Sequence, residues 1–271
     1  MYPAHSKYLN IKARIISNRK LNGNYGHLEF ESGWIAKQAV AGQFVNIKVA
    51  NAPELLLRRP ISIHGIKASK VKIIYEIIGR GTQILAARKP GEFLDMIGPL
   101  GNGFDYSRPL AKSTQAKNIL VAGGIGVAPL VFLADKLMKL KTRKPKPETI
   151  VLMGAKTKEQ ILCRQEFTSL GCTVKLATDD GSLGFKGRVT DLLDLLLEQP
   201  EPVRLFACGP HPMLKTIAQI AHKNKIPAQL SLEEHMACGI GACLGCVVAT
   251  KTGYKSVCQD GPVFSSEELI W

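Results

Sequence analysis

The first hundred residues alternate between apolar and polar positions in short runs separated by turn residues. A period of two is typical of half-buried strands. The strands predicted by this pattern cover residues 12–17, 27–31, 43–49, 61–66 and 71–78. Several short strands at this spacing indicate a small β-barrel. We therefore predict a barrel domain over residues 1–105.

A different pattern follows the polar stretch at residues 106–117. Buried apolar strands are predicted at residues 118–122, 149–154, 173–178 and 203–207. They alternate with segments of helical period at residues 128–140, 159–169, 189–198 and 212–223. This alternation predicts a doubly wound parallel sheet with right-handed crossovers. The fold class expected is multidomain β plus α/β, with an α/β nucleotide domain over residues 106–225.

The alternation stops after residue 226, and residues 226–271 are expected to form a small third domain around cysteines. Its four cysteines follow the spacing CxxxxC, CxxC and then eleven intervening residues: Cys238, Cys243, Cys246 and Cys258. Plant-type ferredoxin loops hold a [2Fe–2S] cluster on thiolates with such spacing. The glycines of the loop allow backbone N–H groups to turn toward sulfur. Structural zinc is the alternative, although such sites usually pair two CxxC knuckles.

Length and composition fit an ordinary globular protein. The chain has 271 residues, of which 45% are hydrophobic, enough for two domains and an appendage. The N-terminal residues 1–7 lack the layout of a secretory signal. The longest apolar stretch, 119–134, is interrupted by glycines and a proline and is too short to span a bilayer. Seven cysteines, an odd number, favour a reducing compartment, and we expect the cytoplasm.

The chain is basic, with a formal net charge of +14. The basic residues are scattered, and their densest run, 141–146, is expected to be a solvated loop. Aromatic residues make up only 6% of the chain, which argues against a nucleic-acid surface. The charge therefore favours anionic dinucleotides or an acidic partner protein.

Two elements of the α/β domain suit a nucleotide. The glycines Gly123, Gly124 and Gly126 follow the first strand, where a pyrophosphate can approach a helix N-terminus. A glycine turn that serves only packing is the alternative. Cys208 ends the fourth strand at the carboxyl edge of the sheet, where open α/β sheets bind ligands, although most free cysteines are buried apolar residues. Cys163 and Cys172 are interpreted as structural.

Two elements of the barrel suit a phosphate. Arg58 and Arg59 precede Ser62 at the start of a strand, and guanidinium groups with a hydroxyl bind phosphates well. The segment 79–82 carries two glycines and Thr82 where a strand gives way to a short helix. The alternative is solvated arginines and a simple turn. No acid–base constellation for an organic substrate is evident, because His64, His211 and His235 are isolated in the sequence.

The order of these parts resembles the ferredoxin-NADP reductase superfamily. The parts that carry the resemblance are segments 59–62, 79–82, 98–101, 123–129, 208–210 and the cysteine loop. Within that superfamily, segments 231–246 and 258–264 are similar to the electron-transfer subunits of NAD-dependent, class B dihydroorotate dehydrogenases. The chain has Ile61 where the superfamily often has an aromatic residue.

The resemblance implies roles for individual residues. The FAD phosphate and the flavin edge would be held by Arg59, Pro60, Ile61 and Ser62. The flavin and its ribityl chain would be lined by Ile74, Tyr75 and Glu76. The FAD pyrophosphate would be contacted by Gly81 and Thr82. The nicotinamide nucleotide would be bordered by Gly124, Gly126 and the candidate catalytic residue Cys208. The cluster would be bound by Cys238, Cys243, Cys246 and Cys258.

The resemblance also implies a function. Nicotinamide exchanges two electrons as a hydride and a cluster passes one at a time, so a flavin must stand between them. The implied partner is an FMN-containing catalytic subunit that oxidises dihydroorotate in pyrimidine biosynthesis, with two copies of each chain. Lys156 and Lys158 stand where a 2′-phosphate could bind, yet the resemblance points to NAD.

Two alternatives stay open at this point. One is a related FAD and [2Fe–2S] reductase subunit that serves a ferredoxin:NADP oxidoreductase, a sulfide dehydrogenase or a hydrogenase. The other is a redox-silent scaffold whose cysteines bind zinc.

Overall fold

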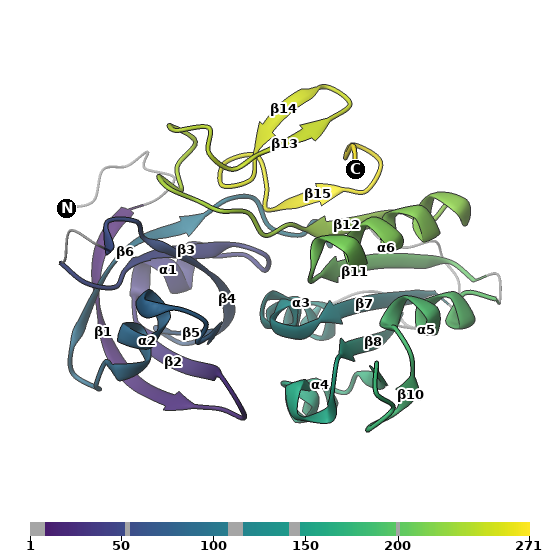
Figure 1. Cartoon of the computed structure of the whole chain (residues 1–271), viewed down its shortest axis with the longest axis horizontal. Helices are drawn as coiled ribbons and strands as arrows, with labels where there is room; N and C mark the ends of the chain where they lie inside the picture. The colour runs from purple at the N-terminus through teal and green to yellow at the C-terminus, as the bar shows by residue number, and fades with distance from the viewer. Residues whose placement is uncertain (1–8, 52–54, 108–115, 141–146, 199–200) are drawn as a thin grey trace.

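The computed structural model of the protein describes residues 9–51, 55–107, 116–140, 147–198 and 201–271. Figure 1 shows a barrel beside an α/β layer, with the cysteine segment lying across both at one end. The N-terminal residues 1–7 and the basic run 141–146 lie outside the described residues, as does most of the polar stretch 106–117. Among the described residues, no helix has the length and apolar character needed to cross a membrane.

The predicted barrel is confirmed. Its antiparallel strands close in the order β1-β2-β5-β4-β3-β6. The strands are β1 (Leu9–Lys20), β2 (Tyr25–Glu31), β3 (Phe44–Lys48), β4 (Arg59–Lys67), β5 (Lys70–Glu76) and β6 (Phe93–Leu100). Two short helices accompany them: α1 (Gly33–Gln38) and α2 (Arg80–Ala87). The sequence pattern did not predict β6, because its Gly98 and Pro99 are residues that usually mark turns.

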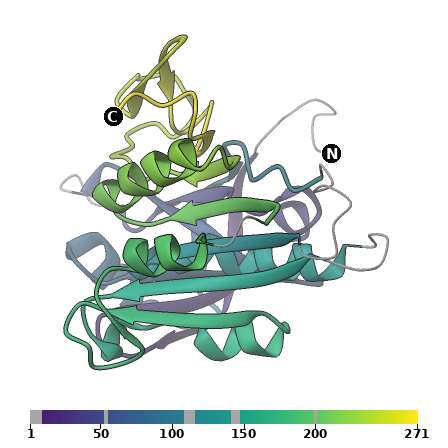
Figure 2. The same cartoon turned by 90° about the vertical axis from the view of Figure 1, so that its right-hand side faces the viewer.

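The predicted parallel sheet is also confirmed, in the order β10-β9-β8-β7-β11-β12-β15. Its strands are β7 (Lys117–Gly123), β8 (Glu148–Ala155), β9 (Thr173–Thr178), β10 (Phe185–Lys186), β11 (Val203–Cys208), β12 (Ala228–Ser231) and β15 (Val263–Ser265). The helices are α3 (Val127–Lys139), α4 (Arg164–Ser169), α5 (Val189–Leu196) and α6 (His211–Lys223). Figures 1 and 2 show α3 and α4 on the face toward the barrel and α5 and α6 on the opposite face.

The structure differs from the expected organisation in two places. The segment 226–271 is not separate from the sheet, because β12 pairs with β11 and β15 pairs with β12. Strands of four and three residues are too short to show a pattern in the sequence. The helix expected at 159–169 is divided into a 3-10 turn at Lys158–Gln160 and α4, because Cys163 has a φ of 61° that no right-handed helix accommodates.

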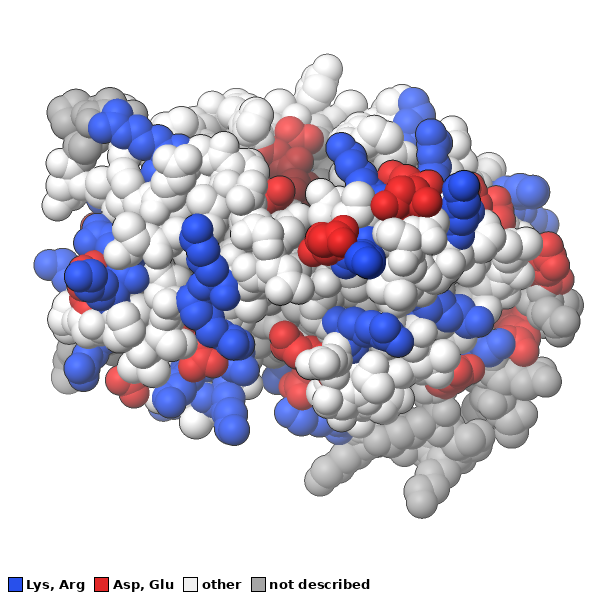
Figure 3. Space-filling model, turned by 60° about the horizontal axis from the view of Figure 1, so that its bottom comes forward, with Lys and Arg blue, Asp and Glu red and all other residues white. Residues whose placement is uncertain are grey.

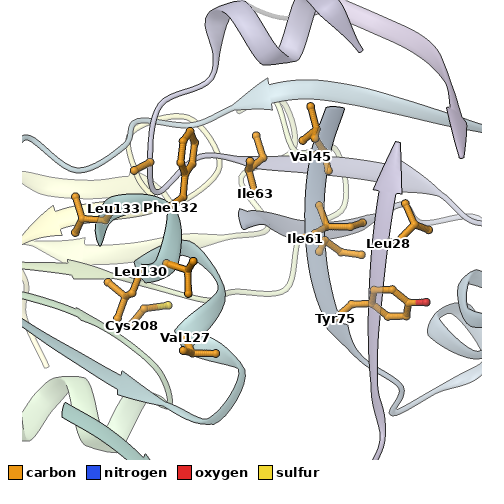
Figure 4. Close-up of a cluster of buried hydrophobic side chains, with 14 of the residues drawn as sticks. Leu28, Val45, Ile61, Ile63, Tyr75, Val127, Leu130, Phe132, Leu133 and Cys208 are labelled. Carbon is orange, nitrogen blue, oxygen red and sulfur yellow. The ribbon is translucent and has the colours of Figure 1, made fainter. Parts of the chain in front are cut away.

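One cluster of buried apolar side chains extends from the barrel into the α/β domain. It includes Ile61 and Ile63 of β4 and Leu130 and Phe132 of α3 (Figure 4). Helix α3 packs against β4, so these side chains join the two domains. The second cluster joins the sheet to the cysteine segment and includes Phe264 of β15. Burial of apolar surface therefore determines how all three parts sit together.

The basic side chains on the face displayed in Figure 3 do not form a single patch. On that face, Lys and Arg side chains are spread over the molecule with Asp and Glu side chains between them (Figure 3). The net charge of +14 is thus distributed rather than concentrated there. This pattern favours a diffuse attraction of anions rather than a groove that binds nucleic acid.

Replacing Phe132 by alanine tests the seam between the domains. Phe132 is 1% exposed, so the Phe132→Ala change leaves a cavity and is expected to lower the free energy of unfolding by about 3–5 kcal/mol. Phe93 is 59% exposed, and Phe93→Ala is the matched control, with an expected change within about 0.5 kcal/mol. Urea titration of both variants measures the difference. Equal effects at the two positions would contradict a packed seam.

Candidate functional site

The cysteine loop turns its backbone N–H groups toward sulfur. The N–H of Gly241 donates to Cys258 Sγ at 3.1 Å, and that of Gly245 donates to Cys243 Sγ at 3.4 Å. Two further N–H groups, of Ile240 and Cys258, donate to Cys238 Sγ and Cys246 Sγ at 3.5 and 3.4 Å. Each thiol thus has a donor that favours its thiolate form.

Glycine is required at two positions of this loop. Gly239 and Gly241 have φ values of 73° and 82°, which other residues rarely adopt. A Cβ at Gly239 would lie 2.4 Å from Asn46 Nδ2, and one at Gly241 would lie 1.8 Å from Gln259 Oε1. The loop closes against its surroundings only because side chains are absent there.

The four cysteines form two electrostatically linked pairs. Burial opposes ionisation of Cys238, but the Ile240 N–H and hydrogen bonding with Cys243 outweigh it and lower the pKa to about 7. Burial, followed by hydrogen bonding with Cys246, raises the pKa of Cys258 to about 12. Hydrogen bonding thus links Cys238 with Cys243 and Cys258 with Cys246, and the charge of Cys238 also raises the pKa of Cys258.

The spread of these sulfurs fits a binuclear cluster better than a single zinc ion. Zinc bound at 2.3 Å to four thiolates needs sulfurs about 3.8 Å apart. Among the described residues, no three of the four loop sulfurs lie within 4.8 Å of one another. The group of donor atoms that does lie so close together belongs to His64, Cys163 and Glu166. Two thiolate pairs, each able to hold one iron, match the ligand set of a [2Fe–2S] cluster.

Asn46 connects the cysteine loop to the barrel, and the sequence analysis did not identify it. It lies fully buried in β3, and its Nδ2 donates to the carbonyl of Cys238 at 3.5 Å. In the sheet it stands opposite Pro60 of the expected flavin motif. Its Oδ1 has no hydrogen-bond partner among the residues that the structure describes. The signal in the sequence was an asparagine inside the apolar strand FVNIK. A buried side-chain amide needs a hydrogen-bond partner, so its presence there indicates a contact with another part of the chain.

The two phosphate-suited elements of the barrel meet in the structure. A Cβ at Gly81 would lie 2.7 Å from Arg59 Nε, so the guanidinium group lies directly on the first turn of α2. Thr82 stabilises that turn, because its hydroxyl accepts the N–H groups of Ile78 and Gly79 at 3.1 and 3.3 Å. Arg58 is directed elsewhere and binds Asp95 Oδ1 at 2.8 Å. Arg59, not the pair of arginines, is therefore placed to bind an anion.

The three residues expected along the flavin do not share one environment. Ile74 and Tyr75 are buried, whereas Glu76 is partly exposed. Burial raises the pKa of Tyr75 to about 12, and its hydroxyl donates to Asn18 Oδ1 at 3.0 Å. Asn18 in turn donates to the carbonyl of Leu85 at the end of α2. Tyr75 thus supports the helix that carries Gly81 and Thr82, and its contact with a flavin stays a prediction.

The glycine turn is in direct contact with the end of β11. Both were expected to border the same nicotinamide nucleotide, and they can do so only if they lie close together. A Cβ at Gly126 would lie 2.3 Å from the carbonyl oxygen of Cys208, and Gly124 has a φ of 54°. Helix α3 begins here without a side-chain cap, directly after a 3-10 turn at Gly124–Gly126 that accepts the Val127 N–H. Ser62 and Pro60 lie on the strand against which α3 packs.

Cys208 itself is 1% exposed. Burial, followed by the charge of Glu233, raises the pKa of its thiol, so the thiol stays neutral. A neutral buried thiol can form part of a wall beside a ring but is a poor nucleophile or base. The catalytic role of Cys208 stays a prediction, and the burial of its side chain favours a role in packing.

Glu233 is a second residue that the sequence analysis did not single out. It follows β12 and retains exposed surface, yet desolvation by the surrounding protein and then the charge of Glu76 raise its pKa. Glu76 belongs to the flavin strand, and Cys208 to the nucleotide edge. An acidic residue between the last parallel strand and the first cysteine was the signal available in the sequence. Glu233 marks where the barrel, the α/β domain and the cysteine segment converge.

The cysteine loop is tested by placing a side chain on Gly239. Gly239→Ala forces a positive φ on alanine, at a cost of about 1–2 kcal/mol, and drives its Cβ into Asn46. We expect a marked loss of bound iron and of cluster absorbance. Gly245→Ala is the matched control, because its Cβ would meet only Cys243 Sγ, at 3.5 Å. Full iron content in the Gly239 variant would refute this account of the loop.

The environment of Glu233 is tested by Glu233→Gln. A carboxyl with a raised pKa in the folded state loses native stability as pH rises from its ordinary pKa of 4.5 through the raised value. The variant cannot ionise, so its stability relative to the wild type should increase over that pH range and level off above it. Melting temperatures across pH, with Glu234→Gln as the charge-matched control, measure this. A stability difference that does not change with pH would contradict it.

Comparison with known proteins agrees with this arrangement. Residues 233–270 match the model of the iron-sulfur cluster binding domain of dihydroorotate dehydrogenase B, and residues 120–219 match that of the oxidoreductase NAD-binding domain. In structure, the chain is similar to an NADH-dependent reduced ferredoxin-NADP oxidoreductase, with a TM-score of 0.82 and 28% identity over 96% of this chain and 90% of the other. A Neisseria gonorrhoeae ferredoxin NADP+ reductase, 15% identical with a TM-score of 0.65 over 81% and 92% of the chains, shares the fold.

Two curated relatives are similar over most of their length. The dihydroorotate dehydrogenase B (NAD(+)) electron transfer subunit of Desulforamulus reducens is 39% identical over 265 residues, covering 96% of this chain and 97% of the relative. The protein of the same name from Geobacillus kaustophilus is 44% identical over 234 residues, covering 84% and 86%. The expected family, fold and iron–sulfur and NAD-binding domains are thereby confirmed. The chain belongs to the family of electron transfer subunits of NAD(+)-dependent dihydroorotate dehydrogenase B.

Proposed function

We propose that the chain passes electrons from an FMN-containing dihydroorotate dehydrogenase subunit through a [2Fe–2S] cluster and FAD to NAD+. The observation that carries this proposal is the contact of Asn46 with the carbonyl of Cys238. It joins the strand beside the flavin motif to the first cysteine of the loop. A bound flavin would supply the conversion between one-electron and two-electron transfer. The physiological setting is pyrimidine biosynthesis in the cytoplasm.

The residues of the chain would divide this work by position. Arg59, with Gly81 and Thr82 at the start of α2, would bind the FAD pyrophosphate. Pro60, Ile61 and Ser62 would contact the flavin edge, with Ile74 and Glu76 on the neighbouring strand. Gly124 and Gly126 at the start of α3 would admit the nucleotide phosphates, beside Cys208.

The partner would dock over the cysteine loop. Exposed apolar side chains gather in this segment: Leu244, Val247 and Tyr254 are 65%, 38% and 80% exposed. Leu244 lies between two of the cluster cysteines, and Tyr254 lies on the hairpin of β13 (Val247–Thr250) and β14 (Gly253–Ser256). Apolar and aromatic side chains near a redox terminal suit a protein interface, where tyrosine often contributes strongly. We infer a complex with two copies of each chain.

The function is tested by reconstitution. The chain, co-purified with the FMN subunit, should reduce NAD+ with dihydroorotate, whereas neither chain alone should do so. Bound FAD and iron are measured on the same sample. Absence of flavin and iron from the purified chain would overturn the proposal.

A second candidate function has one specific observation in its favour. The structural relative with a TM-score of 0.82 is an NADH-dependent reduced ferredoxin-NADP oxidoreductase. Lys156 and Lys158 follow β8, where a 2′-phosphate could bind. Initial rates with NADH and NADPH distinguish the two candidates. A strong preference for NADPH would favour this second function, whereas a preference for NADH together with reduction of NAD+ by dihydroorotate in the presence of the FMN subunit is expected from the first.

The docking surface is tested by Tyr254→Ala. Loss of an exposed aromatic anchor should weaken association with the FMN subunit by about 2 kcal/mol, close to 30-fold in the dissociation constant. Phe93→Ala is the control, because Phe93 is also an exposed aromatic residue but lies at the start of β6 in the barrel. Dissociation constants from titration of the two subunits give the comparison. Equal affinities for both variants would count against this surface.

A further inference from the structure

Three potential metal ligands converge between the barrel and the α/β domain, away from the cysteine loop. His64 is in β4, Glu166 is in α4, and Cys163 is the residue that precedes α4. The nitrogen, sulfur and carboxylate donor atoms of these residues all lie within 4.8 Å of one another. His64 is 1% exposed, Cys163 is partly buried, and the Glu166 side chain is 46% exposed. The cluster therefore has a buried end and an open end.

The orientation of His64 is fixed from the side opposite the cluster. Its Nδ1 lies 3.0 Å from the carbonyl oxygen of Ala128 in α3, so Nδ1 is a donor and carries a proton. Its Nε2 lies 2.9 Å from Glu166 Oε2 in an ion pair, so a proton stands between these two atoms, and a metal ion would take the place of that proton. Histidines that ligate metals usually donate their other ring N–H to a carbonyl in this way. His64 is thus held as a metal ligand would be.

Cys163 has a backbone conformation that its helix-capping position does not explain. Its φ of 61° is unfavourable for a residue with a Cβ, and its side chain does not cap the backbone of α4 but forms a hydrogen bond with the Glu166 side chain. Serine, asparagine or aspartate would cap this helix better. Strain of this kind is found where the side chain has another function.

We propose that His64, Cys163 and Glu166 bind a zinc ion that bridges the flavin barrel and the nucleotide domain. One imidazole, one thiolate and one carboxylate make a ligand set that zinc accepts, and three protein ligands leave a position for water. Binding breaks the S–H bond of Cys163 and displaces the proton between His64 Nε2 and Glu166 Oε2, and both protons go to solvent with no change of oxidation state. The ion would hold α4 against β4.

The cluster is open to solvent on both sides of Glu166. Cys163 and Glu166 line one groove of about 680 Å³, and His64 and Glu166 line another of about 600 Å³. Lys72 also lines the second groove, but its Nζ pairs with Glu29 at 3.6 Å. A hydrated cation can therefore reach the donors from either side.

The experiment adds one equivalent of Zn²⁺ to the protein that retains its FAD and iron. Desalting, metal analysis and zinc K-edge X-ray absorption then measure the amount of zinc and its ligands. We expect one zinc per chain with one sulfur neighbour and otherwise nitrogen and oxygen. Cys163→Ser should lose the sulfur neighbour and bind zinc at least about tenfold more weakly. Cys172→Ser, at a buried cysteine outside the cluster, should bind as the wild type does.

A second variant and a second measurement keep the test decisive. Glu166→Gln changes a partly exposed side chain and should also weaken binding if Cys163→Ser fails to fold. Zinc should raise the melting temperature of the wild type and of Cys172→Ser but not of Cys163→Ser. The proposal is overturned by no bound zinc, by several sulfur neighbours, or by unchanged binding in the folded Cys163 or Glu166 variants.

Discussion

The packing of α3 against β4 is the contact on which the rest of the arrangement depends. Helix α3 begins at the glycine turn that would admit the nucleotide, and β4 begins with the motif expected to hold the flavin. Leu130 and Phe132 on α3 and Ile63 on β4 are fully or almost fully buried. Each such side chain contributes about 1.5–3 kcal/mol when removed from water. Ordinary apolar burial therefore brings together the two elements at which the flavin and the nucleotide are expected.

The cysteine segment is held to this frame by backbone pairing and by the apolar cluster that it shares with the sheet. Strand β15 closes the edge of the parallel sheet, and Asn102 at the end of the barrel bridges to Pro262. Asn102 also donates to the carbonyls of Gln259 and Asp260, next to the last cluster cysteine. A loop whose glycines leave it conformationally free in the unfolded chain gains its geometry from these fixed neighbours. The position of the loop relative to the barrel is thus a property of the whole chain.

Sequence patterns predicted what depends on local chemistry and failed where geometry depends on distant contacts. The spacing of Cys238 to Cys258 and the alternation of strands and helices predicted the cluster segment and the α/β sheet. Strand β12 and the division of the helix at Cys163 were missed, because a four-residue strand and one left-handed residue leave no periodic signal. Asn46, Glu233 and the pairing of His64 with Glu166 join residues far apart in sequence, so they became visible only in the folded chain.

The charges and hydrogen-bond donors differ between the parts of the site according to what each part is expected to bind. Where phosphates are expected, the guanidinium group of Arg59 lies beside α2 and a glycine turn leads into α3. Where the flavin strand meets the nucleotide edge, the groups instead resist ionisation: burial keeps the Cys208 thiol neutral and raises the pKa of Glu233. The cysteine loop follows the opposite principle, because its N–H groups all favour negative sulfur. Positive charge beside α2, groups with raised pKa values where the strands meet and an N–H donor on each cluster sulfur are thus three local arrangements within one packed frame.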